Sequence, residues 1–201
     1  GVGNCSLRES LIVLQALGVL KSKHGIGWYI DRFEPKSSLS FLSPLLEKFA
    51  GISSIAQIME TRLTHEPLIA YKAAEHISPE GIEMLERSLG KMKENRNKPG
   101  RKELRDADRA FHKILAEECG NDVLSIISSI MSGLLFDTVM WVQSASNDDE
   151  VLLYHQQIYD AVAARDSKGA ARAMKQHLIL GWKFLYANHI IQDKYVEELL
   201  F

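Results

Sequence analysis

The sequence has little of what marks secreted or membrane-embedded proteins. Cys5 and Cys119 are its two cysteines and they form no Cys-x-x-Cys pair, so a disulfide framework is not predicted and a reducing cytosol suits the chain. No uninterrupted apolar run reaches the roughly 20 residues that cross a bilayer, and no signal peptide is present. The chain begins at Gly1 rather than at a methionine, so the missing signal carries little weight. We expect a cytoplasmic protein without a membrane partner.

The chain also lacks an excess of charge of one sign. Its 24 Lys and Arg residues nearly balance its 26 Asp and Glu residues, for a formal net charge of −2. No global field therefore draws the protein toward nucleic acid or membrane, and any affinity for DNA must come from a local basic segment. The 201 residues, 46% of them hydrophobic, are enough for one domain, or for one domain and a fragment of another.

Strand signals are absent after residue 44, where helical periodicity takes over. The pattern predicts helices at residues 45–76, 79–95, 101–119, 122–144, 148–165 and 167–199. Ser78-Pro79 and Asp166-Ser167 are expected helix starts, Gly120-Asn121 is an expected stop, and Pro67 should kink the first helix. We therefore predict an all-α, antiparallel bundle of about six helices over residues 45–201.

Residues 1–32 have a different pattern. A short helix is predicted at residues 6–17, with Asn4 or Ser6 as its cap and Glu9, three residues after Ser6, completing a capping box. Two short strands should follow within residues 19–30, around a turn that contains Gly25 and Gly27. A short helix followed by a basic, glycine-tipped hairpin is typical of a winged helix. Prolines and serines in residues 33–44 indicate a linker to the bundle.

Three of the predicted helices each turn a histidine toward an apolar face. Asp108 and His112 stand four residues apart, so they share one face of a helix. Their apolar neighbours at helical spacing are Leu104, Phe111, Leu115 and Cys119. His155 shares a similar stripe with Leu152, Ile158, Tyr159 and Val162, and His177 shares one with Ala170, Met174, Leu178 and Gly181.

Buried imidazoles and carboxylates need partners, and one divalent metal ion would satisfy all four groups at once. The alternative is that each histidine is a hydrogen-bonded core residue and that Asp108–His112 is a simple polar pair. Three such stripes in one domain favour the metal.

Arg62 lies on a helical stripe with Ile55, Met59, Ile69 and Ala73. A guanidinium that faces the interior requires an anion. That anion is either a bound effector or Glu66, four residues further on. His65, His76 and His189 show no spacing to a partner and are expected to be structural or exposed. Trp141, Trp182 and Tyr186 are expected in the core or a pocket wall.

Several spaced motifs resemble those of the GntR-type transcription regulators. Residues 6–20 and Gly25-Ile26-Gly27-Trp28-Tyr29-Ile30 resemble the end of their winged helix-turn-helix. The rest resembles the helical effector domain of the FadR subgroup, the FCD domain. The resemblance rests on Glu60-Thr61-Arg62, Glu66-Pro67, Asp108-x-x-Phe111-His112, Gly120-Asn121, His155-x-x-Ile158, Ala164-Arg165-Asp166 and Ala173-Met174-x-x-His177-Leu178.

The resemblance implies roles for individual residues. Asp108, His112, His155 and His177 become the ligands of a divalent metal, with zinc first and nickel or manganese as alternatives. Arg62 becomes a contact for a small organic-acid effector. The DNA contacts would be Arg8 on the recognition helix and Lys21, Lys23, His24, Gly25 and Gly27 in the wing. Solvated surface positions remain the alternative for Arg8 and for the basic hairpin.

This chain departs from the family pattern in two respects. It starts near the turn before the recognition helix, so the earlier winged-helix elements are expected to be absent and operator binding by residues 1–201 alone is expected to be poor. Asn4-Cys5 stand where members commonly carry Ser-Arg, which removes one guanidinium able to read a guanine.

The predicted function is a homodimeric, non-enzymatic regulator that binds a palindromic operator in double-stranded DNA. A small carboxylate at the metal would modulate that binding. Two alternatives remain open: a metal-dependent, hydrolase-like enzyme, because an open metal position can activate water, and a sensor in which the ion itself is the signal. Four protein ligands could also close a tetrahedral, purely structural site.

Overall fold

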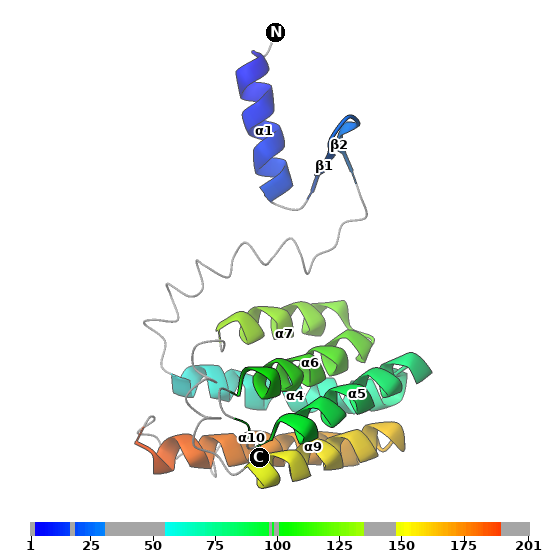
Figure 1. Cartoon of the computed structure of the whole chain (residues 1–201), viewed down its shortest axis with the longest axis vertical. Helices are drawn as coiled ribbons and strands as arrows, with labels where there is room; N and C mark the ends of the chain where they lie inside the picture. Colours follow the sequence, from blue (N-terminus) through cyan, green and yellow to red (C-terminus); the bar gives the residue numbers. More distant parts are fainter. Residues whose placement is uncertain are drawn as a thin grey trace.

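The computed structural model describes residues 3–16, 19–30, 55–96, 98, 101–134 and 148–189. The predicted linker, the start of the predicted 45–76 helix, Trp141 and residues 190–201 lie outside these ranges. Within them the protein is all-α apart from one small hairpin (Figure 1). The predicted fold class is therefore confirmed.

The N-terminal part consists of helix α1 (Asn4–Ala16) and an antiparallel hairpin of β1 (Lys21–Lys23) and β2 (Gly27–Tyr29). Lys21 pairs with Tyr29 and Lys23 with Gly27. Gly25 and Gly27 have φ of 80° and 98°, a region that favours glycine, so the predicted glycine turn is confirmed. The predicted capping box is wrong, because α1 begins at Asn4 and Ser6 lies inside it. No residue of α1 is buried.

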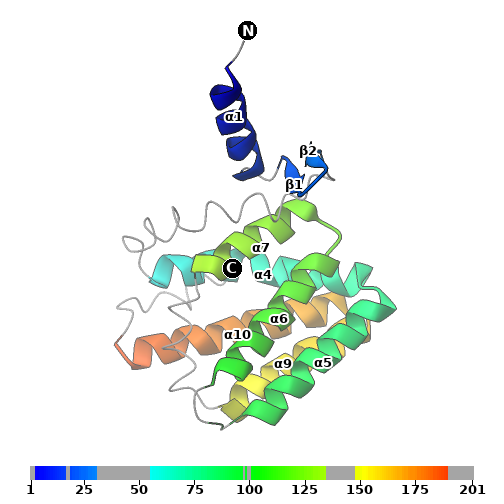
Figure 2. The same cartoon turned by 45° about the horizontal axis from the view of Figure 1, so that its top comes forward.

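The helical domain contains α4 (Ile55–His76), α5 (Pro79–Asn95), α6 (Lys102–Glu118), α7 (Asp122–Leu134), α9 (Asp148–Ala163) and α10 (Ser167–Ala187). Helix α10 packs along α4 and α9, and α5 packs along α6 and α9. Helix α7 crosses the outer side of α4 and α6 (Figures 1 and 2). No helix of the described part is both long and apolar enough to cross a bilayer.

Helix boundaries follow from the predicted local chemistry. The Ser78 hydroxyl accepts a hydrogen bond of 3.0 Å from Gly81 N–H, and Pro79 opens α5. Asp166 caps α10 through Gly169 N–H at 2.9 Å. Gly120 takes a left-handed φ of 64° where α6 ends. Helix α4 continues through Pro67 without interruption.

Aliphatic and aromatic side chains from α4, α5, α6, α9 and α10 form the main core. A smaller cluster joins Met59, Trp182 and Leu185, so the prediction for Trp182 is confirmed. Tyr186 is instead 42% exposed, one residue before α10 ends at Ala187. Asn188 N–H bonds Phe184 O at 3.1 Å and His189 has a φ of 58°. The predicted continuation of this helix is therefore wrong at residues 188 and 189.

Candidate metal centre

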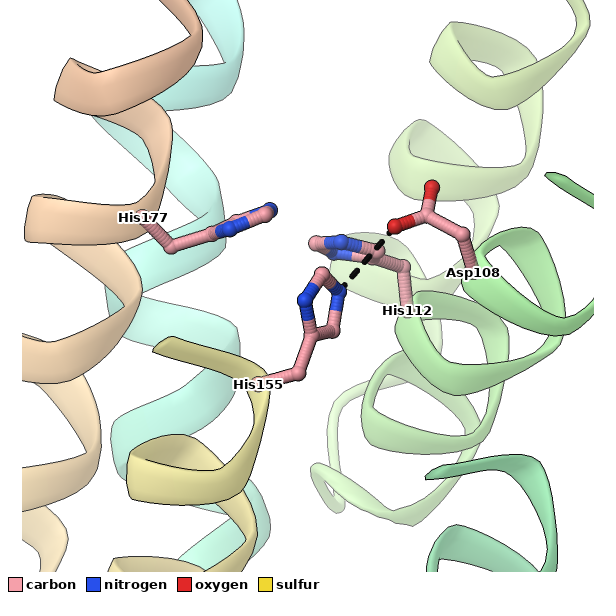
Figure 3. Close-up of side chains that lie close together, drawn as sticks. All are labelled: Asp108, His112, His155 and His177. Atoms are coloured by element: carbon pink, nitrogen blue, oxygen red, sulfur yellow. Dashed lines mark ion pairs between the residues drawn. The ribbon is translucent and has the colours of Figure 1, made fainter. Parts of the chain in front are cut away.

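The four predicted ligands converge between three helices. Asp108 and His112 come from α6, His155 from α9 and His177 from α10, and the side chains point toward one another (Figure 3). One donor atom from each residue lies within 4.8 Å of all the others. The stripes place them there: Phe111, Ile158 and Leu178 on the same faces are at most 1% exposed.

His155 faces Asp108 with its Nε2. Its Nδ1 lies 2.9 Å from Val151 O, and since a carbonyl oxygen only accepts, Nδ1 carries the proton. Nε2 lies 3.0 Å from Asp108 Oδ1, and without a proton of its own it would face the carboxylate as a second acceptor. Two buried acceptors at that distance repel each other unless a proton or a cation lies between them.

His112 also has one ring nitrogen in contact with a residue that is not one of the four predicted ligands. Its Nδ1 lies 2.8 Å from Glu66 Oε2 on α4, within ion-pair distance of the carboxylate. Nε2 is buried and makes no hydrogen bond within the described residues. A histidine whose other nitrogen donates to a carboxylate is the usual arrangement of a metal-binding imidazole.

His177 completes the cluster. Its ring centroid lies 4.3 Å from that of His155 and 5.3 Å from that of His112. Nδ1 is buried and lacks a hydrogen bond to any described residue. Burial, followed by the neighbouring His155 and His112, holds the pKa of His177 well below its usual value. The ring therefore stays neutral, as a metal ligand must.

The carboxylate of Asp108 stays ionised. Burial alone would raise its pKa, but the neighbouring His155, and then His112 and His177, hold it below its usual value. The cluster thus offers one anionic oxygen and three imidazole nitrogens, two of which have no partner among the described residues. This donor set suits zinc, nickel or manganese, so the residues present fit a divalent metal.

Arg62 lies beside the centre but is paired within its own helix. Its Nε donates to Glu66 Oε1, and its Nη2 lies 3.3 Å from Glu66 Oε2. Burial opposes the charge, but Glu66 and then Asp108 hold the pKa of Arg62 above its usual value. The structure therefore contains the intrahelical pair that the sequence left as the alternative to an effector contact.

Sequence reasoning assigned Glu66 only to Arg62 and missed its contact with His112. The available signal was the position of Glu66 on the same apolar stripe of α4. Nothing in the local sequence relates α4 to α6, because Glu66 and His112 lie 46 positions apart in the chain.

The predicted DNA contacts all lie on the surface. Arg8 is exposed on α1, Lys21 and Lys23 are exposed on β1, and Gly25 is exposed in the turn. His24 and Gly27 are also exposed. The basic residues are thus gathered on and around one short hairpin, and their contacts with DNA stay a prediction.

The remaining histidines differ from one another. His76 and His189 are exposed, as expected. His65 is 8% exposed, and its Nδ1 lies 2.6 Å from Thr61 O, which fits the structural role predicted for it.

Comparison with known proteins identifies relatives of this chain. Residues 57–180 match the FCD domain. The HTH-type transcriptional regulator LutR of Bacillus subtilis (strain 168) is 32% identical over 185 residues, which cover 88% of this chain and 82% of LutR. The HTH-type transcriptional repressor NanR of Escherichia coli (strain K12) is 27% identical over 181 residues, covering 88% of this chain and 68% of NanR.

Two solved structures share the fold. Streptococcus agalactiae GntR aligns with a TM-score of 0.63 at 22% identity, over 89% of this chain and 81% of that one. Escherichia coli McbR/YncC aligns with a TM-score of 0.60 at 16% identity, over 94% of this chain and 82% of that one.

Proposed function

Because the chain belongs to the GntR-type regulators with an FCD domain, we propose that it is a transcription regulator controlled by a metal-bound organic acid. In this proposal residues 1–32 contact DNA, residues 33–44 link the two parts, and residues 45–201 hold the metal and the effector. A protein with this task works in the cytoplasm, where the DNA is, and is not an enzyme.

The observation that carries the proposal is the convergence of Asp108, His112, His155 and His177 in a buried cluster. Without a cation, or a proton at His155 Nε2, this set places two acceptors 3.0 Å apart, and it leaves two further ring nitrogens without hydrogen bonds to described residues, which is unfavourable in the interior. A zinc ion, or nickel or manganese, would remove both costs. When bound, it supplies positive charge to which a carboxylate can be attracted.

The effector we propose is a small carboxylate. Metal ions with open positions bind carboxylate and hydroxyl oxygens, and Asp108 lies close enough to Arg62 to help raise the pKa of its guanidinium. The guanidinium would contribute a second attractive group for the anion. A changed helix packing would then alter the placement of the DNA-binding parts.

The DNA partner we propose is a palindromic operator, bound by a homodimer with one half-site for each protomer. Arg8 would contact base or phosphate, and Lys21, Lys23, His24, Gly25 and Gly27 would approach the DNA backbone. The names of the relatives LutR and NanR support regulation of transcription.

The test replaces His155, which is 0% exposed and points into the cluster, with alanine. We expect loss of the bound metal and loss of the thermal stabilisation that zinc gives the unmodified protein. That stabilisation is about 2.7 kcal/mol at a hundredfold excess of free metal over the dissociation constant. Elemental analysis and melting curves with and without zinc provide the measurement.

His189→Ala is the matched control, since His189 is exposed at the end of α10. Full metal binding by His155→Ala would exclude the proposed ligand set. Loss of the metal without loss of affinity for a small carboxylate would make the ion structural and Arg62 the main anchor. A regulatory response to zinc alone, with rapid release of the ion, would favour the metal sensor.

A further inference from the structure

Glu66 lies on α4 with its carboxylate between a guanidinium and an imidazole. The residue is 7% exposed. Oε1 accepts from Arg62 Nε, and Oε2 lies 3.3 Å from Arg62 Nη2 and 2.8 Å from His112 Nδ1. A buried carboxylate is tolerated only when its oxygens are paired, and both oxygens of Glu66 are. The residue is nonetheless outside the four converging groups of the cluster.

We infer that Glu66 is a positioning residue that joins the metal centre to Arg62; this rests on the proposed function. The contact with Oε2 fixes which nitrogen of His112 carries the proton and which way the ring faces. The ligand belongs to α6, but its orientation is held from α4. Carboxylates in this position raise the affinity of the histidine for the metal.

The carboxylate of Glu66 also connects the proposed metal ion to Arg62, the proposed contact for the effector. Arg62 uses two of its nitrogens on Glu66 and is held at the edge of the centre by them. An ion that draws His112 inward therefore acts on Glu66, and through it on Arg62. Coupling of this kind is reciprocal, so the state of Arg62 must also change the affinity for the metal.

The contact between Glu66 and His112 means that the Arg62–Glu66 pair can exist and still take part in metal binding. Arg62 and Glu66 stand four residues apart and would pair on an isolated helix. Only Glu66 reaches the adjacent helix, where it contacts His112 on α6. The pair is thus one element of a chain of contacts from α4 to the metal ligands.

The first experiment measures the affinity of Glu66→Gln for cobalt and zinc against a competing chelator. We expect binding that is about 10- to 100-fold weaker, still with one ion per chain, and a changed visible spectrum of the cobalt form. The spectrum reports ligand geometry, which a purely structural loss would leave unchanged. Glu75→Gln, exposed on the same helix, is the control and should bind metal normally.

The second experiment introduces Arg62→Lys with and without Glu66→Gln. Lysine keeps the positive charge but not the planar fork. Because Arg62 is held by Glu66, we expect a several-fold loss of metal affinity when Glu66 is present and a clearly smaller loss in the Glu66→Gln background, where only the direct charge interaction with Asp108 remains. Equal losses in both backgrounds would overturn the inference.

Unchanged affinity and spectrum in Glu66→Gln would overturn it as well. Should that variant fail to fold, Glu66→Asp replaces it: the charge is kept, but the side chain is too short to bridge both partners, so the same loss is expected. If the unmodified protein binds no metal, the proposed function itself fails. If the unmodified protein binds metal and the Glu66 variants bind it equally well, only the inference about Glu66 fails.

Discussion

At the residue scale, the interior of the helical domain holds a connected set of ionisable groups. Burial alone would raise the pKa of Glu66, but Arg62 and then His112 hold it well below its usual value. The pKa of Asp108 is lowered and so is that of His177. All three shifts keep each group in the form that suits a metal centre, with ionised carboxylates and a neutral imidazole.

These shifts predict the pH dependence of stability in the metal-free protein. The unfolded chain protonates His177 below about pH 6.5 and the carboxylates below about pH 4, whereas the folded protein resists both steps. The unfolded state therefore binds more protons, and the free energy of unfolding falls as the pH falls through these two windows. Urea unfolding with a chelator present, from pH 8 down to 3, measures it.

His177→Gln isolates the upper window of this pH dependence. It should flatten the dependence between about pH 6.5 and 5, whereas His189→Gln, at an exposed position, should not. A stability that rises on acidification through this range would contradict the assignment.

At the element scale, one arginine ties the α9–α10 connection to the end of α4. Arg165 has a φ of 57°, and its guanidinium donates to three carbonyls: Ala74 O at 3.4 Å, Glu75 O at 3.3 Å and Ile77 O at 2.7 Å. The last carbonyls of a helix have no partner within it. Arg165 thus supplies donors from a segment about 90 residues away in the chain.

Arg165→Asn should therefore destabilise the protein by about 1–2 kcal/mol, from the loss of charged hydrogen bonds at a partly exposed site. Asparagine tolerates the left-handed backbone, so the change removes the guanidinium without new strain. Denaturant unfolding at neutral pH provides the measurement, with Arg172→Ala, exposed on α10, as the control. A loss equal to that of the control would show that the three carbonyl contacts contribute little.

At the scale of the whole molecule, α7 buries two of its serines and exposes two of its aliphatic side chains, whereas a surface helix usually buries its apolar residues. Ser125 and Ser128 are 4% and 6% exposed, whereas Val123 and Ile127 are 65% and 36% exposed. On α4, which packs against α7, Leu68 is 48% exposed. The hydroxyls of Thr61 and Thr64, also exposed on α4, bond carbonyls of their own helix at 2.8 and 2.9 Å, which lowers the polarity of this surface.

We expect this surface to face the second copy in the proposed dimer. Asp122 is the single charged residue of α7, so two copies related by a two-fold axis would meet without bringing many like charges together. We therefore expect Ile127→Glu to shift the proposed dimer toward monomer by at least tenfold in its dissociation constant, because each copy would bury a charge. Sedimentation equilibrium measures the change.

Leu153→Glu is the control for that experiment. Leu153 is 55% exposed on α9, so it tests whether any exposed leucine has the same effect. An Ile127→Glu protein that dimerises as the unmodified chain does would place the interface elsewhere.

Local sequence determined much of this protein. The periodicity of the apolar residues and the caps at Ser78 and Asp166 determine the helices, because these interactions act between residues within one or two turns. The same periodicity put Asp108 and His112 on one face. The periodicity did not predict the start of α1 or the end of α10 at residues 188–189, because helix and turn differ little in free energy over a few residues.

The spaced motifs of the sequence, which resemble those of the GntR-type regulators, were enough to predict the family. The same motifs singled out the four residues that the helices bring together. What they left open was the partner of Arg62, because an effector and Glu66 offer the same carboxylate chemistry.

Only the tertiary structure decided which residues of different helices contact one another. The contact of Glu66 with His112 and the hydrogen bonds of Arg165 to the end of α4 join residues far apart in the chain. The packing of α7 against α4 and α6 decides which face of α7 is exposed. Such contacts depend on how whole helices pack, and packing is set by the sum of many weak interactions over the core rather than by the residues that make the contact.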